Sequence, residues 1–447
     1  FIHCLLINAA VDTSNVYNCI TEWFSNKMSK PYLHFVLNIL TRIKIGFNED
    51  IFCFRMILAE GLGRVLSLSH KTFAGLLDLR RSDIVELSMV HLVDVLRSIL
   101  MLPEHINIPA AWFGADLANK SDIWHYKLQD EEIGELITAA NKFCASGEEL
   151  GKINPQNFVL DKFAVRLFEL QEELKTGIGF KLISGLPVGQ LTPELYSTVF
   201  CGLGSFLGKA RSQNAAGHLL GHVRDTGASA KDPSVRIYQT SARQTFHTDR
   251  SDVVGLLCIR EAKEGGDSLL ASSVTAFNEV MKKSPSLAEE LMRPVAYDRR
   301  GEIPTGQKPY MTIPVVNWYK GKLTCIYQRE YIISAQRYED APKLTKSQIE
   351  AFDLFDEVLN DDKINLKMRL RPGDMQFVYN HSLFHDRTGF VDWPEPEKTR
   401  HLLRLWISLP GDRELPPTFS QAYGNLDVGD RGGVVTKETV LHAPLDA

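Results

Sequence analysis

Two segments of the sequence, far apart in the chain, carry side chains that could hold one metal ion. Residues 246–249 read Phe-His-Thr-Asp and stand just before the apolar stretch 253–259. Side chains at positions i and i+2 of an extended segment point to the same side, so His247 and Asp249 can offer a nitrogen and a carboxylate oxygen to one ion. A His-x-Asp triplet arises by chance in a chain of this length, so the pair needs a third ligand before it indicates a site.

The second segment, residues 380–387, offers that ligand in the order Asn-His-Ser-Leu-Phe-His-Asp-Arg. It follows a predicted strand at 375–379, which a turn at 371–374 introduces. Either His381 or His385 could complete a set of two histidines and one carboxylate on one face of an octahedron. This arrangement leaves three coordination positions open, of which two can take a keto acid and the third dioxygen.

Residues 400–407 predict a strand that carries two arginines, Arg400 and Arg404, on one face. An arginine that looks into a barrel is costly to bury unless it meets an anion. The distal carboxylate of 2-oxoglutarate is such an anion, and a guanidinium group binds it through two parallel hydrogen bonds. The apolar residues around Arg404 indicate that it is the deeper of the two, so we expect Arg404 to be the anchor and Arg400 to contribute less.

The chain resembles the taurine dioxygenase (TauD/TfdA) family in four motifs that occur in the family's order. They are residues 246–249, Gly265-Gly266-Asp267-Ser268, residues 380–390 and residues 400–406. The similarity runs from about residue 111 to about residue 433, roughly three quarters of the chain.

This resemblance implies a double-stranded β-helix fold, iron(II) as the cofactor, and 2-oxoglutarate and dioxygen as co-substrates. Succinate and carbon dioxide are the implied co-products. The family's third metal ligand stands two residues before an arginine, here Arg387, which selects His385 rather than His381. The implied ligands are therefore His247, Asp249 and His385.

Several residues near these motifs have further interpretations. In some family members a threonine after the double glycine helps to bind 2-oxoglutarate; alanine stands at the aligned position here, and Ser272 is expected to supply the hydroxyl. His381 is interpreted as a surface residue or a neighbour of the metal ligands, and His401 and Trp406 as packing residues. Arg387 is interpreted either as an ion-pair partner or as a group near the co-substrate carboxylates.

The pattern of apolar residues and turn signals predicts an α+β fold with a mainly β core. Helices are predicted at residues 130–146, 161–174, 276–283 and 346–359, with a further one opening at 191–194. Strands are predicted at residues 179–184, 235–240, 253–259, 268–271, 323–328, 366–370, 375–379 and 401–408. Short strands with turn-rich connections favour a double-sheet jelly roll, the double-stranded β-helix, with flanking helices rather than a doubly wound parallel sheet.

The first hundred or so residues carry no chemical motif, which indicates a chain of two parts. We expect a mostly helical N-terminal extension at residues 1–105 and the oxygenase domain at residues 106–447. Residues 84–102 have the spacing of an amphipathic packing helix; a membrane-surface helix is the alternative, which the scarcity of Lys and Arg disfavours. The chain does not begin with Met and its apolar start lacks a basic region, so a fragment or a misplaced gene start fits better than a secretory signal.

Composition narrows the class of partner. A net charge of −5 gives no long-range attraction to nucleic acid or to an anionic membrane, so a small-molecule substrate is expected. No apolar run reaches the roughly 18 residues of a membrane-spanning helix. The seven cysteines are scattered and form no C-x-x-C pair, so neither a disulfide framework nor a thiolate zinc site is indicated, and a reducing, cytoplasmic location is expected.

These observations lead to one expected function and two alternatives. We expect an Fe(II)- and 2-oxoglutarate-dependent dioxygenase that hydroxylates or otherwise oxidises a small molecule. The first alternative is a metal-binding relative without turnover that acts as a binding or regulatory protein; the intact ligand set and the arginine speak against it. The second is a metal-dependent hydrolase or isomerase on a similar barrel, for which the sequence offers no dedicated general base and no use for Arg404.

Overall fold

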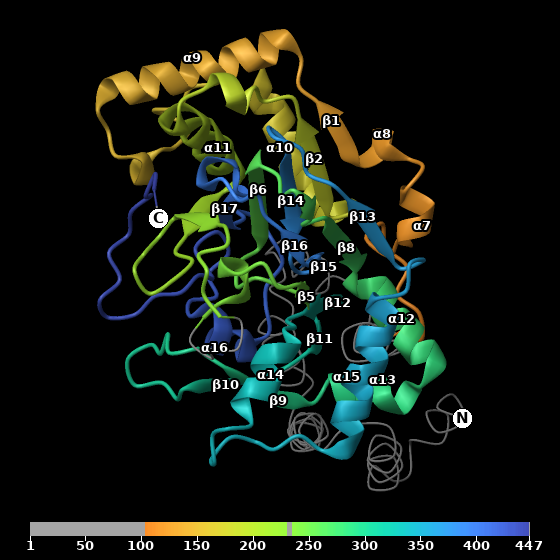
Figure 1. The fold of residues 1–447 in the computed structure, drawn as a ribbon. Coiled ribbons are helices and arrows are strands. Elements are labelled where there is room, and N and C mark those ends of the chain that lie inside the picture. Colours follow the sequence, from red (N-terminus) through yellow and green to blue (C-terminus); the bar gives the residue numbers. More distant parts are fainter. Residues whose placement is uncertain (1–102, 230–234, 447) are drawn as a thin grey trace, which may run out of the picture. The chain divides into compact units, whose positions relative to one another are not determined.

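Two main β-sheets and the helices outside them make up the part of the chain that the computed structural model describes, residues 103–229 and 235–446 (Figure 1). These residues belong to one compact unit, Val95–Ala447. The helix predicted at residues 84–102 lies outside the described residues. None of the described helices has both the length and the apolar character needed to cross a membrane.

The larger sheet contains seven of the described strands. In order across the sheet they are β1 (His125–Lys127), β2 (Phe180–Ser184), β14 (Met375–Tyr379), β6 (Val253–Arg260), β17 (His401–Ser408) and β3 (Lys209–Arg211), with β4 (Leu220–Val223) also paired to β17. Neighbouring strands are antiparallel, except that β1 and β2 are parallel. Since β17 pairs with β6, the arginine strand lies beside the segment that follows the His-x-Asp motif.

The smaller sheet is antiparallel and contains four of the described strands. Their order is β13 (Asn365–Met368), β8 (Ser268–Ser272), β15 (Leu383–Arg387) and β5 (Gln244–His247). Three two-stranded ribbons are formed by β9 (Pro294–Asp298) with β10 (Tyr310–Pro314), β11 (Val316–Tyr319) with β12 (Lys322–Cys325), and β7 (Glu264–Gly265) with β16 (Phe390–Val391).

Side chains from the two sheets pack into one apolar cluster. Val254, Cys258, Leu402 and Trp406 of the larger sheet join Leu270 and Leu383 of the smaller sheet in this cluster. The alternating residues Val253, Leu257, Leu403 and Leu405 belong to a second cluster on the other face of the larger sheet. Successive side chains of a strand point to opposite faces of the sheet. Arg404 therefore shares the face between the two sheets with Leu402 and Trp406, while Leu403 and Leu405 point to the other face.

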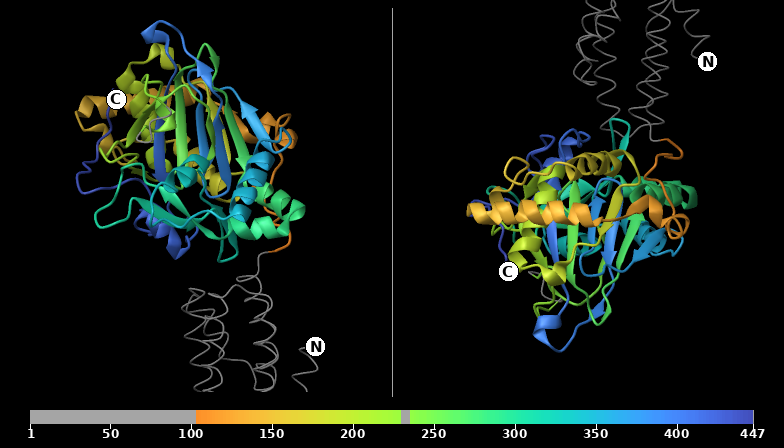
Figure 2. Two further views of the ribbon diagram at one scale, coloured as in Figure 1. Left: turned by 60° about the horizontal axis from the view of Figure 1, so that its bottom comes forward. Right: turned by 90° about the horizontal axis from the view of Figure 1, so that it is seen from above.

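Helices cover the outer face of each sheet (Figure 2). The cluster behind the larger sheet includes residues of α9 (Asp130–Ser146), α10 (Phe163–Thr176) and α11 (Pro193–Leu207). The cluster behind the smaller sheet includes residues of α12 (Ser273–Lys283), α13 (Pro285–Leu291) and α15 (Lys346–Leu359). The shorter helices are α7 (Gly114–Leu117), α8 (Ser121–Trp124), α14 (Arg329–Ala335) and α16 (Ser420–Tyr423).

Local signals explain where the long helices begin. Thr192 caps α11 by accepting a hydrogen bond from the backbone N–H of Leu195, and Pro193 occupies the first turn. Thr345 and Gln348 form a capping box at the start of α15. The predicted helix at 346–359 and the predicted helix at 130–146 are therefore confirmed to the residue.

The strands predicted at 375–379 and 401–408 are confirmed to the residue, and five others are present with an end shifted by one to three residues, but the strand predicted at 235–240 is wrong. That segment holds a short 3-10 helix, η3 (Ile237–Gln239), closed by a hydrogen bond from the Thr240 N–H to the Ile237 carbonyl. Its side chains are held by tertiary contacts rather than by a strand partner: Arg236 pairs with Glu302, and the guanidinium of Arg404 lies over the Tyr238 ring. The structure is a mixed α/β fold with a large antiparallel sheet, as the mainly β core predicted.

Candidate active site

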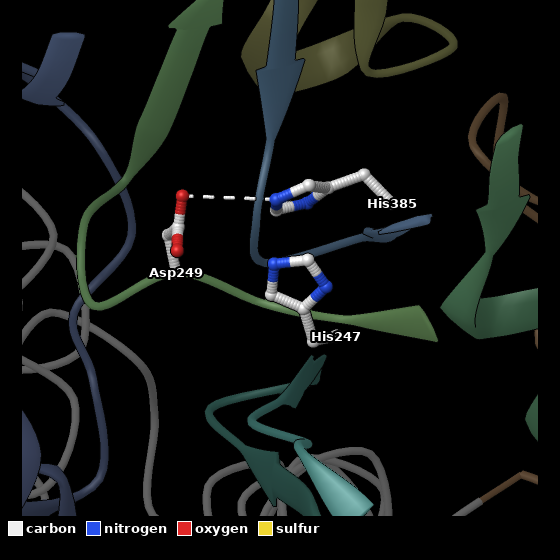
Figure 3. A group of neighbouring side chains, drawn as sticks. All are labelled: His247, Asp249 and His385. Carbon is white, nitrogen blue, oxygen red and sulfur yellow. Dashed lines mark ion pairs between the residues drawn. The ribbon is translucent and has the colours of Figure 1, made fainter. Parts of the chain in front are cut away.

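His247 and His385 face each other on neighbouring strands of the smaller sheet. His247 is the last residue of β5, His385 is the middle residue of β15, and the two are paired directly in antiparallel register. Their ring centroids lie 4.1 Å apart (Figure 3). Residues that lie opposite each other on antiparallel strands place their side chains together on one face, so the pairing of β5 with β15 unites two distant motifs.

Asp249 adds a carboxylate from the segment just after β5. Its Oδ2 atom lies 3.6 Å from Nε2 of His385, as the dashed line in Figure 3 marks. One potential ligand atom from each of His247, Asp249 and His385 lies within 4.8 Å of the other two, and all three residues are buried. The structure thus brings the three sequence-predicted ligands together, and their binding of iron stays a prediction.

The imidazole of His247 is oriented by its own strand. Its Nδ1 lies 2.8 Å from the carbonyl oxygen of Thr245, which can only accept, so Nδ1 carries the proton. Nε2 is therefore the unprotonated nitrogen, and the side-chain amide of Gln244 donates to it over 2.8 Å. The hydrogen bond at Nδ1 fixes the tautomer that a ligand histidine needs, and the Gln244 amide occupies the lone pair of Nε2 that a metal ion would take.

Asp249 is held from two sides. The indole Nε1 of Trp406 donates to Asp249 Oδ2 over 2.7 Å, and the backbone N–H of Asp249 donates to Oδ1 of Asn380 over 3.1 Å. The Asn380 amide in turn donates to the carbonyl oxygen of Ser251. Trp406 was expected only to pack and Asn380 had no assigned role, so both positioning contacts come from the tertiary structure.

The protonation states of two of the candidate ligands suit a cation. Burial lowers the pKa of His247 to about 3, and the neighbouring His385 adds to this effect, so its imidazole is neutral at physiological pH. Burial alone would raise the pKa of Asp249, but the charge of Arg404 and the interaction with His385 outweigh it and hold that pKa well below its ordinary value. An unprotonated imidazole and an ionised carboxylate are the forms that bind a metal.

The donor set fits iron(II). Two histidines and one carboxylate on one side of an ion form the facial triad of non-haem iron oxygenases, and it leaves positions for a chelating co-substrate and dioxygen. Within the described residues a second cluster of possible ligands, Asp252, His381 and Asp412, is also present. The guanidinium of Arg431 already neutralises this second cluster, because it donates to Asp252 over 2.8 Å and to Asp412 over 2.9 Å.

His381 belongs to that second cluster. It is fully buried and its Nε2 lies 2.7 Å from Oδ1 of Asp252, so the interpretation of His381 as a surface residue is wrong. The alternative interpretation, a neighbour of the metal ligands, holds only indirectly. His381 contacts Asp252, and Asn380, the residue before His381, binds the backbone of both Asp252 and Asp249. His381 thus serves a buried ion network that braces the end of β14.

Arg404 lies beside the three candidate ligands. Its guanidinium is 3.7 Å from Asp249 Oδ2, and its Nε donates to the side-chain oxygen of Gln213 over 2.7 Å. Tyr238 and Trp406 present their rings to the same guanidinium, at 4.6 and 5.1 Å from the centroids. Arg404 therefore already has an acidic neighbour, a hydrogen-bond acceptor and two aromatic rings.

Arg400 has a different environment at the start of β17. The expectation that Arg404 is the deeper arginine is wrong, because both residues are 5% exposed. The NH1 group of Arg400 is buried without a hydrogen-bond partner, and no described carboxylate forms an ion pair with it. Burial lowers the pKa of Arg400 to about 10.

Arg387 adds a second positive charge near Arg400. Both guanidinium groups lie over the Phe390 ring, 4.7 and 5.1 Å from its centroid. Burial, followed by the charge of Arg400, lowers the pKa of Arg387 to about 9. NH1 and NH2 of Arg387 donate to the carbonyl oxygens of Thr240 and Ala242, and its Nε has no partner. Two buried like charges with unused donors form a site that an anion would stabilise.

The double glycine makes room for this pair of arginines. Gly266 adopts a positive φ of 72°, and a Cβ atom on it would lie 2.9 Å from Nε of Arg400. Ser272, which was expected to supply a hydroxyl to the co-substrate, instead caps α12: its Oγ accepts from the Thr275 N–H and donates to the carbonyl of Ala110. Its hydroxyl is thus committed to the fold and does not line the pocket.

A pocket opens beside the candidate ligands. The residues that line it come from the segments around η3, β5, the β12–α14 connection and β17: Arg236, Ile237, Tyr238, Gln244, His247, Thr248, Asp249, Arg250, Tyr297, Met311, Ile326, Tyr327, Gln328, Tyr331, Arg404, Trp406 and Val434. Sequence reasoning did not identify Arg250, Tyr238 or Gln213 as site residues. Only Arg250 had a local signal, since it directly follows Asp249.

The contact between Trp406 and Asp249 leads to a first prediction. Trp406→Phe should lower the affinity for Fe(II) or Mn(II) by about 10- to 100-fold, because outer hydrogen-bond partners of metal ligands contribute about that much. The measurement is a metal titration under anaerobic conditions, with exposed Trp393→Phe as the matched control. An unchanged affinity in Trp406→Phe would show that the indole only fills space.

Comparisons with known proteins show the family of the chain. The family model described as "Taurine catabolism dioxygenase TauD, TfdA family" matches residues 146–406. FR-33289 synthase of Streptomyces rubellomurinus is 29% identical over 317 residues, which cover 70% of this chain and 92% of that protein. The taurine hydroxylase-like protein SAT17 of Stachybotrys chartarum is 29% identical over 328 residues, 71% of this chain and 83% of that protein.

The fold also matches a solved structure. An asparagine oxygenase bound to Fe(II), 3-hydroxyasparagine and succinate superposes with a TM-score of 0.50 at 16% identity, over 64% of this chain and 93% of that one. At this identity the match concerns the fold alone. The family model spans more than half of the chain and contains all three candidate metal ligands. The chain therefore belongs to the TauD, TfdA family and is a non-haem iron dioxygenase that uses 2-oxoglutarate.

Proposed function

We propose that this dioxygenase hydroxylates a small organic molecule while 2-oxoglutarate is converted to succinate and carbon dioxide. The observation that carries the proposal is the buried cluster of His247, Asp249 and His385, with ligand atoms within 4.8 Å of one another, beside a pocket that His247 and Asp249 line. The names of the relatives support a small substrate, since one is called taurine hydroxylase-like, and the asparagine oxygenase holds a hydroxylated amino acid. We place the oxygenase domain at residues 106–447.

In this proposal His247, Asp249 and His385 hold iron(II), which when bound supplies the activation of dioxygen. The protein positions the metal ligands and the substrate, and it excludes water from them. Thr245 and Gln244 keep Nε2 of His247 free of a proton, Trp406 holds the Asp249 carboxylate, and Asn380 holds the backbone N–H of Asp249. The aromatic and apolar pocket residues Tyr297, Met311, Ile326 and Tyr327 limit the access of water beside the ligands.

The distal carboxylate of 2-oxoglutarate needs a cation at a distance from the metal. The sequence pattern assigns this role to Arg404, and that assignment stays a prediction. A specific observation favours Arg400: it has a buried donor without a partner and Arg387 beside it, whereas Arg404 already faces Asp249 and Gln213. Arg387 stands two residues beyond His385 on β15, about 7 Å along a strand, a length comparable to the carbon chain of the co-substrate.

The finer form of the fold is part of the proposal. A double-stranded β-helix consists of two facing antiparallel sheets with the metal between them. The apolar cluster shared by the two main sheets and the position of Arg404 on that face support this arrangement. Under it, β5 and β15 provide the ligands and β17 provides the arginines.

The proposed reaction can be tested by succinate formation. Purified protein with Fe(II), 2-oxoglutarate and dioxygen should form succinate, and the right substrate should raise the rate and gain one oxygen atom by mass. The measurement is chromatographic quantification of succinate against product, with omission of iron as the control. Metal binding without any succinate would favour the binding-protein alternative, and conversion of substrate without 2-oxoglutarate would favour the hydrolase or isomerase.

A further inference from the structure

Arg250 is a pocket-lining arginine that neither the metal site nor the co-substrate site uses. It directly follows Asp249 and its side chain lines the pocket. Among the described residues, no carboxylate forms an ion pair with its guanidinium, and no side chain or carbonyl accepts a hydrogen bond from it. An arginine held in a pocket without an acceptor has five unused donors in a fixed planar fork.

The charged groups that face Arg250 have the same sign. Arg236 and Arg299 are the charged neighbours that act on it, with the rings of Tyr331 and Tyr423 close by. Arg236 is neutralised by Glu302, but Arg299 is buried and donates its Nε only to the carbonyl oxygen of Lys308. Neither Arg250 nor Arg299 has a described counter-charge, and of the two Arg250 lines the pocket while Arg299 acts on it from behind.

The pocket itself offers no described acid to balance these charges. Asp249 is the single acidic residue among the described residues that line it, and the candidate metal site and Arg404 both make use of Asp249. Gathering like charges in a partly buried site is costly unless an anion occupies it. A bound anionic ligand would supply the negative charge that the described lining of the pocket lacks.

A neutral donor lies next to Arg250. Tyr331 lines the pocket, and its hydroxyl makes no hydrogen bond to any described residue. Its ring is held in place by the guanidinium of Arg300, 4.7 Å from the ring centroid. A guanidinium fork with a phenolic O–H beside it can donate to several oxygens of one tetrahedral group, and the nearby charge of Arg299 adds to the attraction for a dianion over a carboxylate.

We infer that Arg250, assisted by Tyr331, binds a phosphate or phosphonate group carried by the primary substrate. The inference rests on the proposed function, because it treats this pocket as the substrate pocket. It separates two anion sites: the co-substrate carboxylate at the β17 arginines, and the substrate's dianion at Arg250. A substrate anchored by its dianion would present the rest of its carbon skeleton toward His247 and Asp249, the two candidate metal ligands that line the same pocket.

The test measures binding of inorganic phosphate and of methylphosphonate to the full-length protein by calorimetry, without oxygen, in the presence of Fe(II) and saturating 2-oxoglutarate. We expect both probes to bind, with acetate at least tenfold weaker. Arg250→Ala should weaken phosphate binding at least tenfold, Arg250→Lys should lie between the two, and Tyr331→Phe should weaken it a few-fold. The matched control is Arg293→Ala, an exposed arginine paired with Glu290, which should bind phosphate like the wild type.

Three results would overturn the inference: no phosphate binding by the wild type, equal binding by the wild type and Arg250→Ala, or binding that 2-oxoglutarate displaces. The last result would place the probe at the co-substrate site. Succinate formation by the wild-type protein is measured in the same preparation. If succinate does not form while phosphate binds through Arg250, the proposed reaction fails and the anion site stands.

Discussion

Replacing any one of His247, Asp249 and His385 by alanine should reduce iron-dependent succinate formation by more than about a hundredfold. Loss of a mere hydrogen-bond partner of a ligand costs about 10- to 100-fold in affinity or activity, and loss of a ligand also destroys the facial geometry. The three side chains form one buried cluster, so each is needed. Bound Fe(II) per chain, measured after anaerobic gel filtration, should fall in parallel with succinate formation.

Two histidine variants control this experiment. Exposed His105→Ala should bind iron and form succinate like the wild type. His381→Ala should keep its iron per folded molecule but unfold at a lower temperature. The substitution removes the hydrogen-bond partner of the buried Asp252, which also binds Arg431, and such a loss lowers the free energy of unfolding by about 1–3 kcal/mol. If His381→Ala folded normally without iron while His385→Ala retained it, His381 would be the third ligand.

Arg400→Ala should raise the concentration of 2-oxoglutarate needed for half-maximal succinate formation by roughly ten- to a hundredfold. A hydrogen bond to a charged group contributes roughly 1.5–3 kcal/mol, and about 1.4 kcal/mol corresponds to a factor of ten. Arg400 is buried with an unused donor, so the carboxylate would supply its missing partner. Arg400→Lys should lie between wild type and alanine, because lysine keeps the charge but loses the two-point geometry.

Arg404→Ala is the comparison that decides between the two arginines. Its guanidinium already contacts Asp249 and Gln213, so we expect a change of only a few-fold in the 2-oxoglutarate requirement. A large effect at Arg404 with a small one at Arg400 would return the anchor to the residue that the sequence pattern favours. Binding of 2-oxoglutarate to the iron-loaded protein, followed by its charge-transfer absorbance, distinguishes lost co-substrate from lost metal.

The sequence determined much of the local structure. The helices α9 and α15 have the predicted ends because caps such as Thr345 act over three residues, a range that the sequence displays directly. Likewise, the alternation of β17 showed that Arg404 shares a face with apolar residues of the core. The candidate ligands were found for the same reason, since i and i+2 spacing on a strand is a local property.

The tertiary structure alone decided everything that depends on strand pairing. The family resemblance selected His385, and the structure gives the reason: β15 pairs with β5 so that His385 lies opposite His247, whereas His381 precedes β15 and contacts Asp252. Arg404 contacts Gln213 and Asp249, and Ser272 donates to Ala110; because these partners come from segments distant in sequence, the contacts could not be read from neighbouring residues. Arg250 could not be identified from the sequence for the same reason. Whether a described carboxylate pairs with it depends on which distant segments surround the folded pocket, and none of them supplies a counter-charge to Arg250.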